Sequence, residues 1–313
     1  MNSHEMLPLI SICLCTYKRP FLLTKCLDSL ANQDYDKPYE IIIVDNDSEL
    51  SGKNVVDAQR SAFVNKGISI SYFVEPIQNI ALARNRCVNL ARAKYIAFID
   101  DDEYASSHWL KNMYKVLIET NADGVWGAVL PNIPESFPLW MRRSKVFHRP
   151  VLKDKSIMNN NGLRTGNALV KKEILTKRNG PFDQVLGRTG GSDSELFNWI
   201  LIHNAGIKYV WAENAEVEEI IEEKRMKLAW HLIRGYRGGW STSKKKTTEI
   251  GIFSTIVVMV LLRVPLGIIK ALILLVIDMQ NPKASFLMFA RNIAAQLGKI
   301  GYFLGIKMEE YKG

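Results

Sequence analysis

The chain has 313 residues, of which 47% are hydrophobic and 23% charged, with a formal net charge of +9. This length holds one large domain or two smaller ones. The positive charge points to anionic partners such as phosphate-bearing substrates or an anionic membrane surface. Nothing has the spacing of a nucleic-acid-binding module, so we expect no nucleic-acid partner. The N-terminus lacks the basic and apolar regions of a signal peptide, and none is expected.

All four cysteines lie in the first third of the chain, at Cys13, Cys15, Cys26 and Cys87. No second group of cysteines or histidines follows at a matching distance. Neither a zinc site nor a disulfide framework is therefore expected. We expect reduced thiols in the core of a cytosolic protein.

The first third of the chain alternates between strand-like and helix-like patterns. Apolar runs typical of strands cover residues 9–16, 39–44, 68–74 and 95–99, and helical periodicity covers 21–30, 54–64 and 80–93. Pro20 suits the first turn of the first helix. This alternation predicts an α/β fold with a mostly parallel sheet and right-handed crossovers.

The strand at 95–99 ends abruptly in four acids, Asp100, Asp101, Asp102 and Glu103. Unpaired carboxylates are too costly to bury, so these acids mark the end of the strand and crowd one another. A hard divalent cation with oxygen ligands relieves that repulsion. A solvated acidic turn is an equally good interpretation of this stretch taken alone.

Polar residues follow three of these strands, at Thr16–Arg19, Asp45 and the Asp100 cluster. In open α/β sheets, ligands bind outside the carboxyl ends of the strands. No G-x-G-x-x-G follows the first strand and no Gly-rich Lys-Ser/Thr loop is present, which disfavours a dinucleotide site and a P-loop. Carboxylates that bridge a metal to a diphosphate are the alternative.

The second half begins with a helical pattern over 109–119 and a strand-like run over 124–129. Residues 131–163 lack periodicity, which at this length indicates a functional or mobile loop. Strand-like runs return at 165–170 and 207–211. Between them, a Gly-rich turn delivers Asp193 and Glu195 to the start of a helix expected over 195–204.

From about Leu9 to about Trp240 the chain resembles the GT-A fold family 2 glycosyltransferases, inverting enzymes that use nucleotide-sugars. Four segments carry the resemblance in the family's order, and the downstream Gly191–Glu195 is similar to the family's Gly-Glu-Asp-x-Glu segment. The order and spacing are specific, although each motif alone is weak. The four segments are Ser11–Pro20, Ile43–Ser48, Ala83–Asn85 and the D-x-D-like Asp100–Asp102.

The resemblance implies a mixed GT-A sheet flanked by helices, with a nucleotide-sugar site at its edge. It makes Asp100 and Asp102 the candidate ligands of Mn²⁺ or Mg²⁺, while phosphates and water supply the remaining ligands. Asp101 and Glu103 are alternatively contacts for ribose or sugar hydroxyls. The candidate nucleotide-binding residues are Thr16, Tyr17, Arg19, Asp45, Arg84, Asp100 and Asp101.

Three of these candidates have alternative roles. Asp45 can accept a hydrogen bond from the imide N–H of uracil or thymine, which favours a UDP-linked donor, or it can cap a helix. Arg84 is favoured as a buried ion-pair partner of the acids, with an indirect effect on substrate. Arg19 can equally be a solvated surface charge.

Asp193 matches the family's catalytic base. A single base that takes the proton of the acceptor hydroxyl predicts inversion at the anomeric carbon. Glu195, Gly166 and Asn167 are candidate acceptor contacts. The structural alternative for Asp193 is a first-turn acid at a helix N-terminus. A lone histidine such as His231 is more often structural than a metal ligand.

The chain departs from the family pattern at three places. Asn79 stands where a glycine precedes the Arg84 helix, and asparagine tolerates left-handed backbone better than most residues. Ser192 stands where glutamate is common. The Gln-x-x-Arg-Trp motif of processive members is absent, which favours the addition of a single sugar.

Composition changes after Trp240. Lys244–Lys246 precede apolar runs over 250–262 and 266–277, separated by Arg263 and Pro265, and each run is shorter than the ~20 residues of a membrane span. One tilted span, a re-entrant hairpin and interfacial helices are the alternatives, and an amphipathic helix is expected over 284–304. We favour monotopic or peripheral attachment to the cytoplasmic face of the cell membrane over a buried helical subdomain or oligomer interface.

The sequence therefore predicts a catalytic domain over 1–243 and a membrane-associating region over 244–313. The predicted function is metal-assisted, inverting transfer of one sugar from a nucleotide-sugar to a lipid-linked or cell-surface glycan. One alternative is a nucleotidyltransferase on a similar sheet, which needs a phosphate-binding loop after the first strand. Another is a non-catalytic membrane scaffold, against which the intact acids argue.

Overall fold

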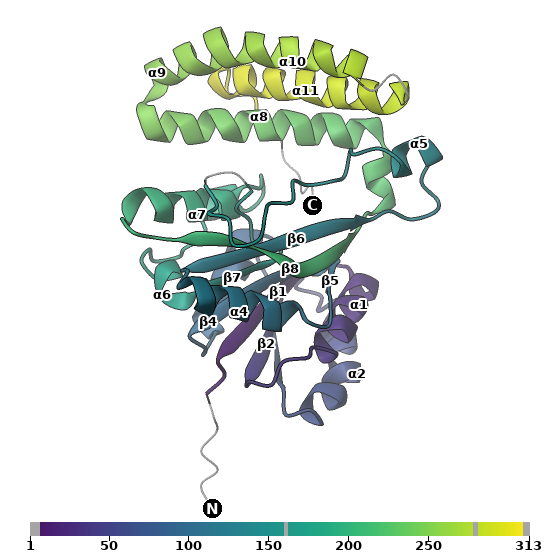
Figure 1. The fold of residues 1–313 in the computed structure, drawn as a ribbon, viewed down its shortest axis with the longest axis vertical. Coiled ribbons are helices and arrows are strands. Elements are labelled where there is room, and N and C mark those ends of the chain that lie inside the picture. The colour runs from purple at the N-terminus through teal and green to yellow at the C-terminus, as the bar shows by residue number, and fades with distance from the viewer. Residues whose placement is uncertain (1–6, 160–161, 278–280, 309–313) are drawn as a thin grey trace, which may run out of the picture. The chain divides into compact units, whose positions relative to one another are not determined.

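The computed structural model describes residues 7–159, 162–277 and 281–308. The chain divides into two compact units (Figure 1). The sheet unit consists of Met1–Leu130 and Arg149–Glu219, and the helical unit of Pro131–His148 and Ile220–Gly313. The boundary predicted after residue 243 falls inside helix α8, Leu228–Ile250. The assignment of catalysis and membrane association to the two parts stays a prediction.

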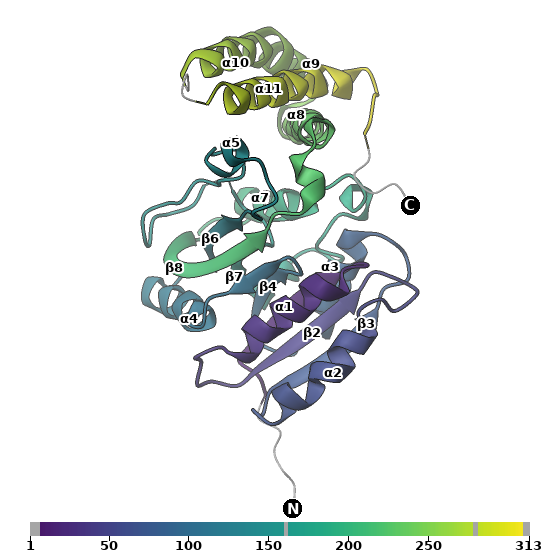
Figure 2. The same ribbon diagram turned by 90° about the vertical axis from the view of Figure 1, so that its right-hand side faces the viewer.

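The sheet unit is built on one mixed, eight-stranded sheet with the order β3-β2-β1-β4-β7-β6-β8-β5 (Figure 2). The strands β3, β2, β1 and β4 are parallel, whereas β7 is antiparallel to both β4 and β6, and β5 is antiparallel to β8. The bounds are β1 Ile10–Thr16, β2 Tyr39–Asp45, β3 Ser69–Val74, β4 Tyr95–Asp100, β5 Glu103–Ala105, β6 Gly124–Asn132, β7 Ala168–Lys171 and β8 Tyr209–Ile220.

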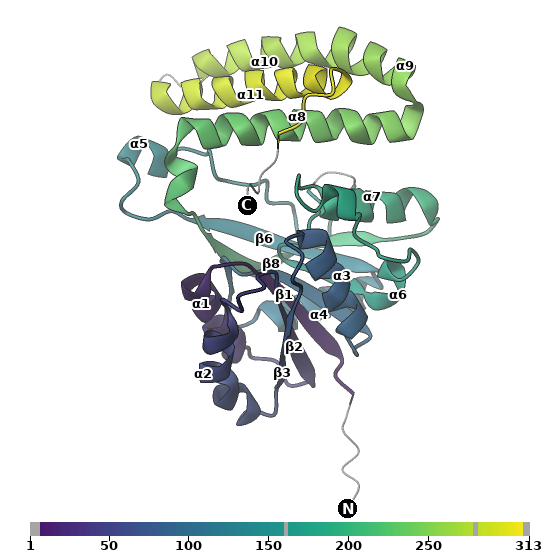
Figure 3. The same cartoon turned by 180° about the vertical axis from the view of Figure 1, so that it is seen from behind.

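Helices cover both faces of this sheet, because the buried strands are apolar on both sides. In β2, Ile41 and Ile43 face one hydrophobic cluster with α1, α2 and α4, whereas Ile42 and Val44 face a second cluster with α3 and α7. Figure 3 shows α1 and α2 on one side of the parallel strands and α3 on the other. The bounds are α1 Pro20–Ala31, α2 Lys53–Val64, α3 Ile80–Leu90, α4 Trp109–Thr120, α6 Lys172–Leu175, η1 Gln184–Leu186 and α7 Ser192–His203.

The antiparallel half of the sheet differs most from the sequence prediction. Strand β7 begins at Ala168 rather than at 165, because Asn167 has a left-handed φ of 59° that ends the extended backbone before it. Strand β8 continues to Ile220, well beyond the predicted end at 211, with exposed residues alternating with buried ones in its second half. The three-residue β5 was not predicted, since its first residue belongs to the acidic run.

The helical unit contains three long helices, α8, α10 and α11, that run side by side (Figure 1). Helices α8 and α11 approach closely through glycines: a Cβ on Gly235 or Gly239 would lie 2.4 or 1.8 Å from the carbonyl oxygens of Arg291 and Ala295. Such small-residue contacts bring backbones together and allow Cα–H···O interactions. The remaining bounds are α5 Leu139–Arg142, η2 Glu223–Met226, α9 Ile252–Ile256, η3 Val257–Arg263, α10 Val264–Ile277 and α11 Pro282–Phe303.

The two apolar runs of the tail form one continuous helical segment that runs through Arg263 and Pro265, and this continuity was one of the alternatives left open by the sequence. The π-helical segment η3 ends at Arg263, just before Pro265, whose ring would clash within a regular α-helix. Ile252–Ile273 is the only described helix long and apolar enough to cross a membrane, with 22 residues, mean hydropathy 2.4 and only 17% of its window buried. A core helix of a soluble protein can meet the same length and composition test.

Candidate active site

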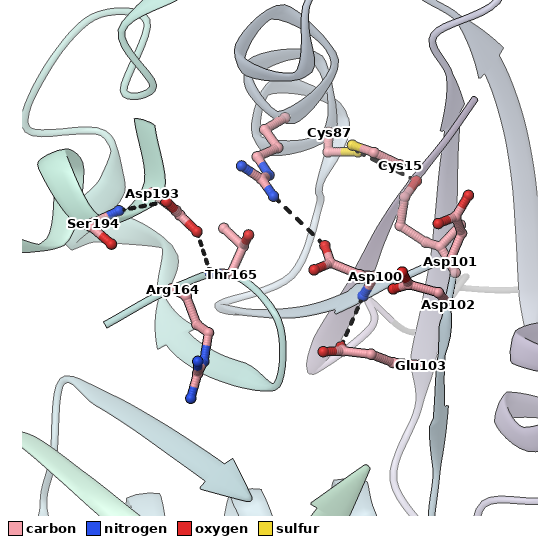
Figure 4. Close-up of polar contacts among 12 residues, drawn as sticks. Cys15, Cys87, Asp100, Asp101, Asp102, Glu103, Arg164, Thr165, Asp193 and Ser194 are labelled. Atoms are coloured by element: carbon pink, nitrogen blue, oxygen red, sulfur yellow. Dashed lines mark hydrogen bonds and ion pairs between the residues drawn. The ribbon is translucent and has the colours of Figure 1, made fainter. Parts of the chain in front are cut away.

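The acidic cluster lies at the carboxyl edge of the parallel strands, as the sequence predicted. Thr16 at the end of β1 pairs with Asp45 at the end of β2, and Cys15 pairs with Asp100 at the end of β4. Asp101 and Asp102 follow in a turn, and Glu103 begins β5 (Figure 4). The register of neighbouring strands therefore brings all three polar strand ends to one edge.

Arg19 and Thr16 hold Asp101. The Arg19 guanidinium lies 2.9 Å from Asp101 Oδ1 and 3.4 Å from Asp102 Oδ2, and Thr16 donates its hydroxyl to Asp101 Oδ2 at 2.9 Å. Lys18 adopts a left-handed φ of 52°, which turns the chain so that Arg19 faces the acids. Burial raises the pKa of Asp101, and the Arg19 charge opposes that shift. Arg19 is thus paired with the acids rather than a solvated surface charge. Tyr17 is half-buried, and the Lys18 ammonium lies 5.6 Å from its ring centroid.

Asp102 and Asp100 have the donor chemistry that a hard divalent cation requires. Burial, and then the charges of Asp101 and Asp100, raise the pKa of Asp102 to about 7. Asp100 keeps 45% of its side chain exposed and pairs with Arg84 at 3.6 Å, as predicted for Arg84. The described residues contain no group of three potential metal ligands. Two carboxylates suffice for Mg²⁺ or Mn²⁺ when phosphates and water complete the shell, so the residues fit such a metal.

Gly166 makes room for the acids. A Cβ at this position would lie 2.6 Å from Glu103 Oε1 and 3.1 Å from Asp100 Oδ2. Glu103 is buried, and its other oxygen accepts the backbone N–H of Asp100 at 3.1 Å. Burial, and then the charge of Asp100, raise the pKa of Glu103 well above its usual range. Glu103 therefore shapes the turn and leaves Asp100 to face outward.

Two predicted contacts have structural roles. Asp45 is fully buried and accepts hydrogen bonds from the backbone of Asp47 and Gly52 and from the Tyr72 hydroxyl, at 3.0, 2.7 and 2.7 Å. Asp45 thus fixes the turn that leads into α2, but it is not the cap of that helix, since the N-cap is Gly52 and α2 has no side-chain cap. Asn167 is fully buried and donates to two carbonyl oxygens while accepting the Trp109 indole N–H at 2.7 Å.

The sequence predicted that Asn79 preserves a left-handed turn before α3. This prediction was wrong, because the turn is not left-handed at Asn79. Its φ of −164° is extended, and its side chain caps α3 by accepting the N–H groups of Ala81 and Leu82. A capping side chain replaces the glycine of the family pattern, since it satisfies amides that the first helical turn leaves unpaired.

Asp193 and Glu195 lie in the first turn of α7 but engage different partners. Asp193 is half-buried, and it accepts the backbone N–H groups of Ser194 at 2.7 Å and of Thr165 at 3.4 Å (Figure 4). Glu195 forms a bidentate ion pair with Arg178, with N–O distances of 2.8 and 2.7 Å. Asp193 thus faces the segment that leads to Gly166, whereas the Glu195 carboxylate is already paired.

Three further charged residues near the acids were not predicted from the sequence: Arg149, Arg164 and Glu219. Arg149 pairs with Glu219 at 2.6 Å, and Arg164 directly precedes Thr165. Only the position of Arg164 immediately before the Thr165-Gly166-Asn167 segment could have drawn attention to it. Cys15 and Cys87 are free thiols with their sulfur atoms 3.8 Å apart.

The mixed sheet, with carboxylates at the carboxyl edge of its parallel strands, has the GT-A fold that the resemblance implied, and a solved mannosyltransferase shares this fold. Mannosyltransferase PcManGT from Pyrobaculum calidifontis, solved with GDP-Man and Mn²⁺, has a TM-score of 0.60 over 94% of this chain and 87% of that chain, at 15% identity. S. aureus TarS 1-349 with UDP has a TM-score of 0.54 over 95% and 91% of the two chains, at 12% identity. At these identities the likeness shows the fold alone.

The chain belongs to glycosyl transferase family 2, whose family model matches residues 11–178. The succinoglycan biosynthesis protein ExoM of Rhizobium meliloti is 33% identical over 235 residues, which are 74% of this chain and 72% of that protein. Glycosyltransferase AglE of Haloferax volcanii is 28% identical over 177 residues, or 56% of each chain. The chain is therefore a glycosyltransferase.

Proposed function

We propose that the chain transfers one sugar from a nucleotide-sugar, with inversion, to a lipid-linked or cell-surface glycan. The observation that carries the proposal is the connection between Asp193 and the acids. Asp193 accepts the Thr165 amide, and the next residue, Gly166, lies against Glu103 and Asp100. One short segment, Thr165–Gly166, thereby joins the proposed base to the proposed metal ligands, which supports a donor phosphate and an acceptor hydroxyl bound side by side. The name of ExoM, a succinoglycan biosynthesis protein, supports a surface-glycan acceptor.

For the donor, we propose a UDP-linked sugar held with Mn²⁺ or Mg²⁺ by Asp100 and Asp102. A bound cation would neutralise the diphosphate as it departs. Arg19 keeps Asp101 and Asp102 in place, and Arg84 fixes the outward-facing Asp100. The fold neighbours bind UDP in one case and GDP-Man with Mn²⁺ in the other. The base contact of Asp45 would require a change in its present hydrogen bonds.

For the transfer step, Asp193 is the proposed general base. Its carboxylate takes the proton of the acceptor hydroxyl as that oxygen bonds to the anomeric carbon, and the bond from this carbon to the phosphate oxygen breaks. The short bond from the Ser194 N–H orients Oδ1, whereas the 3.4 Å contact from Thr165 leaves Oδ2 loosely held. Attack from the side opposite to the leaving diphosphate inverts the anomeric carbon.

For the helical unit, we propose peripheral or monotopic attachment to the cytoplasmic face of a membrane. Residues 131–148 and 220–313 contain 18 Lys and Arg and 7 Asp and Glu, against 41 and 32 in the whole chain. The positive excess of the chain therefore lies entirely in this unit. Phe253, Leu261 and Leu266 are 78, 63 and 64% exposed. Apolar area combined with basic residues suits an anionic lipid surface.

Thermal unfolding of the detergent-purified chain with a panel of nucleoside diphosphates, with and without Mn²⁺, tests the donor site. A ligand at 100 times its Kd stabilises the folded state by about 2.7 kcal/mol. We expect a metal-dependent shift for UDP that Asp102→Ala abolishes. The absence of any shift would contradict the proposal, and release of pyrophosphate during turnover would favour a nucleotidyltransferase. A flotation assay with anionic and with neutral vesicles tests the proposed membrane surface. We expect the chain to float with the anionic vesicles but not with the neutral ones.

A further inference from the structure

Arg164 is half-buried, and no described carboxylate lies within ion-pair distance of its guanidinium. Among the residues that the structure describes, its guanidinium has neither a hydrogen-bond nor an ion-pair partner. The surrounding charges are Arg149, Glu103, Asp193 and Glu219. Each of these has its own partner: Arg149 pairs with Glu219, Glu103 binds the Asp100 amide, and Asp193 binds two amides. Arg164 differs from all of them in this respect.

The backbone around Arg164 is firmly held, so the position of its side chain is not the result of a loose loop. Ser194 donates its hydroxyl to the carbonyl of Leu163 at 2.8 Å, and the Thr165 amide binds Asp193. The carbonyl of Arg164 itself accepts the Trp126 indole N–H at 2.8 Å. In Figure 4 Arg164 adjoins Thr165, and its side chain extends away from Asp193. The chain therefore holds this guanidinium in a fixed place among the charges of Arg149, Glu103, Asp193 and Glu219.

Holding such a cation has a cost that a substrate anion can remove. Burial, and then the nearby Arg149 charge, lower the pKa of Arg164 to about 10, so the guanidinium remains charged at neutral pH. A desolvated charge without a hydrogen-bonded partner is unfavourable. Arginine offers a planar fork of N–H donors that matches the oxygens of phosphate and carboxylate groups.

We propose that Arg164 binds a phosphate group of a substrate in the active site. This inference rests on the proposed function and deepens it. The phosphate belongs either to the nucleotide donor or to a phosphate-linked acceptor, both of which bring negative charge to a site that already holds four acids. A fixed cation there offsets this repulsion and stabilises charge that develops on the leaving group. Thr165 and Gly166 connect it directly to Asp193 and to the acidic cluster.

The test compares Arg164→Met, Arg164→Lys and the control Arg60→Met, whose exposed guanidinium lies on α2 and binds the Ile70 carbonyl. Affinities for uridine, UMP and UDP are measured with Mg²⁺ on the full-length chain in detergent. If the phosphate is the donor's, Arg164→Met weakens UDP by about 10- to 100-fold and leaves uridine unchanged. If it is the acceptor's, UDP is unaffected, and KM rises for a phosphate-linked acceptor but not for a phosphate-free analogue. Arg164→Lys recovers part of either loss.

Two further measurements separate binding from folding. Without ligand, Arg164→Met should melt no lower than the wild type, since it removes an unpartnered charge, whereas a structural role would lower the melting temperature. Inorganic pyrophosphate is a probe that does not depend on the donor base. If no nucleoside diphosphate binds, the proposed function fails, but an Arg164-dependent response to pyrophosphate still supports the phosphate site. The proposal is overturned if UDP, pyrophosphate and phosphate-linked acceptor all behave alike in the wild type and Arg164→Met.

Discussion

The substitution Gly166→Ala tests how tightly the acidic cluster is packed. The added Cβ would lie 2.6 Å from Glu103 Oε1, and an ordinary contact begins at 3.4 Å, so this oxygen must retreat by about 0.8 Å. Glu103 is 1% exposed and its other oxygen binds the Asp100 amide, so it has little room to move. Overpacking of a close-packed site costs about 1–3 kcal/mol. The movement also shifts Asp100, a proposed metal ligand.

We therefore expect Gly166→Ala to lower the free energy of unfolding by about 1–3 kcal/mol and to reduce kcat/KM by at least about tenfold, a change of 1.4 kcal/mol in the barrier. Urea unfolding and sugar-transfer assays measure the two effects. The matched control is Gly238→Ala, because a Cβ there meets no atom within 4 Å and alanine favours the helix. Adding Glu103→Asp, which shortens the clashing side chain, should restore part of the stability. Full activity and stability of Gly166→Ala would refute this reasoning.

Three more predictions concern the base, the helix contact and a buried histidine. Asp193→Asn should lower kcat by about 10²–10⁴-fold while UDP affinity stays unchanged; a normal kcat would exclude Asp193 as the base. Gly239→Leu should destabilise the α8–α11 pair by at least about 2 kcal/mol in urea unfolding, since even its Cβ would lie 1.8 Å from a carbonyl oxygen, whereas wild-type stability would contradict this packing. Burial and then the Arg291 charge lower the pKa of His231 to about 4, below the unfolded value of 6.5, so its neutral form stabilises the fold above pH 6.5. That contribution is lost as the pH falls toward 4. Between pH 7 and pH 4, the free energy of unfolding of the wild type should therefore fall by about 2 kcal/mol more than that of His231→Gln. Equal losses in the two proteins would refute the prediction.

The position of His231 also decides between its two predicted roles. Its ring is fully buried in the helical unit and packs against Phe147 and Trp230, with centroids 5.7 and 4.9 Å apart. A lone histidine among aromatic rings is a core residue, which agrees with the structural interpretation. Sequence alone could not separate the two roles, because burial of one side chain depends on residues that are distant in the chain.

Local patterns in the sequence determined most of the parallel half of the fold. Strands at 9–16, 39–44 and 95–99 became β1, β2 and β4 almost unchanged, since side-chain alternation and burial on both faces are written into each segment. The convergence of Thr16, Asp45 and Asp100 at one edge also followed, because parallel strands end at the same side of a sheet. The family motifs then indicated the type of chemistry at that edge.

Only the tertiary structure decided which partner each charged or polar group has. Asp101 binds Arg19, Glu195 binds Arg178, Asp45 and Asn167 bind groups of the fold, and Arg164 is left without a described partner. The antiparallel strands β5 and β8 and the continuous helical tail likewise depended on packing. The physical reason is that hydrogen bonds and ion pairs join residues far apart in sequence, 82 positions for Arg19 and Asp101, whereas periodicity reports only on neighbours.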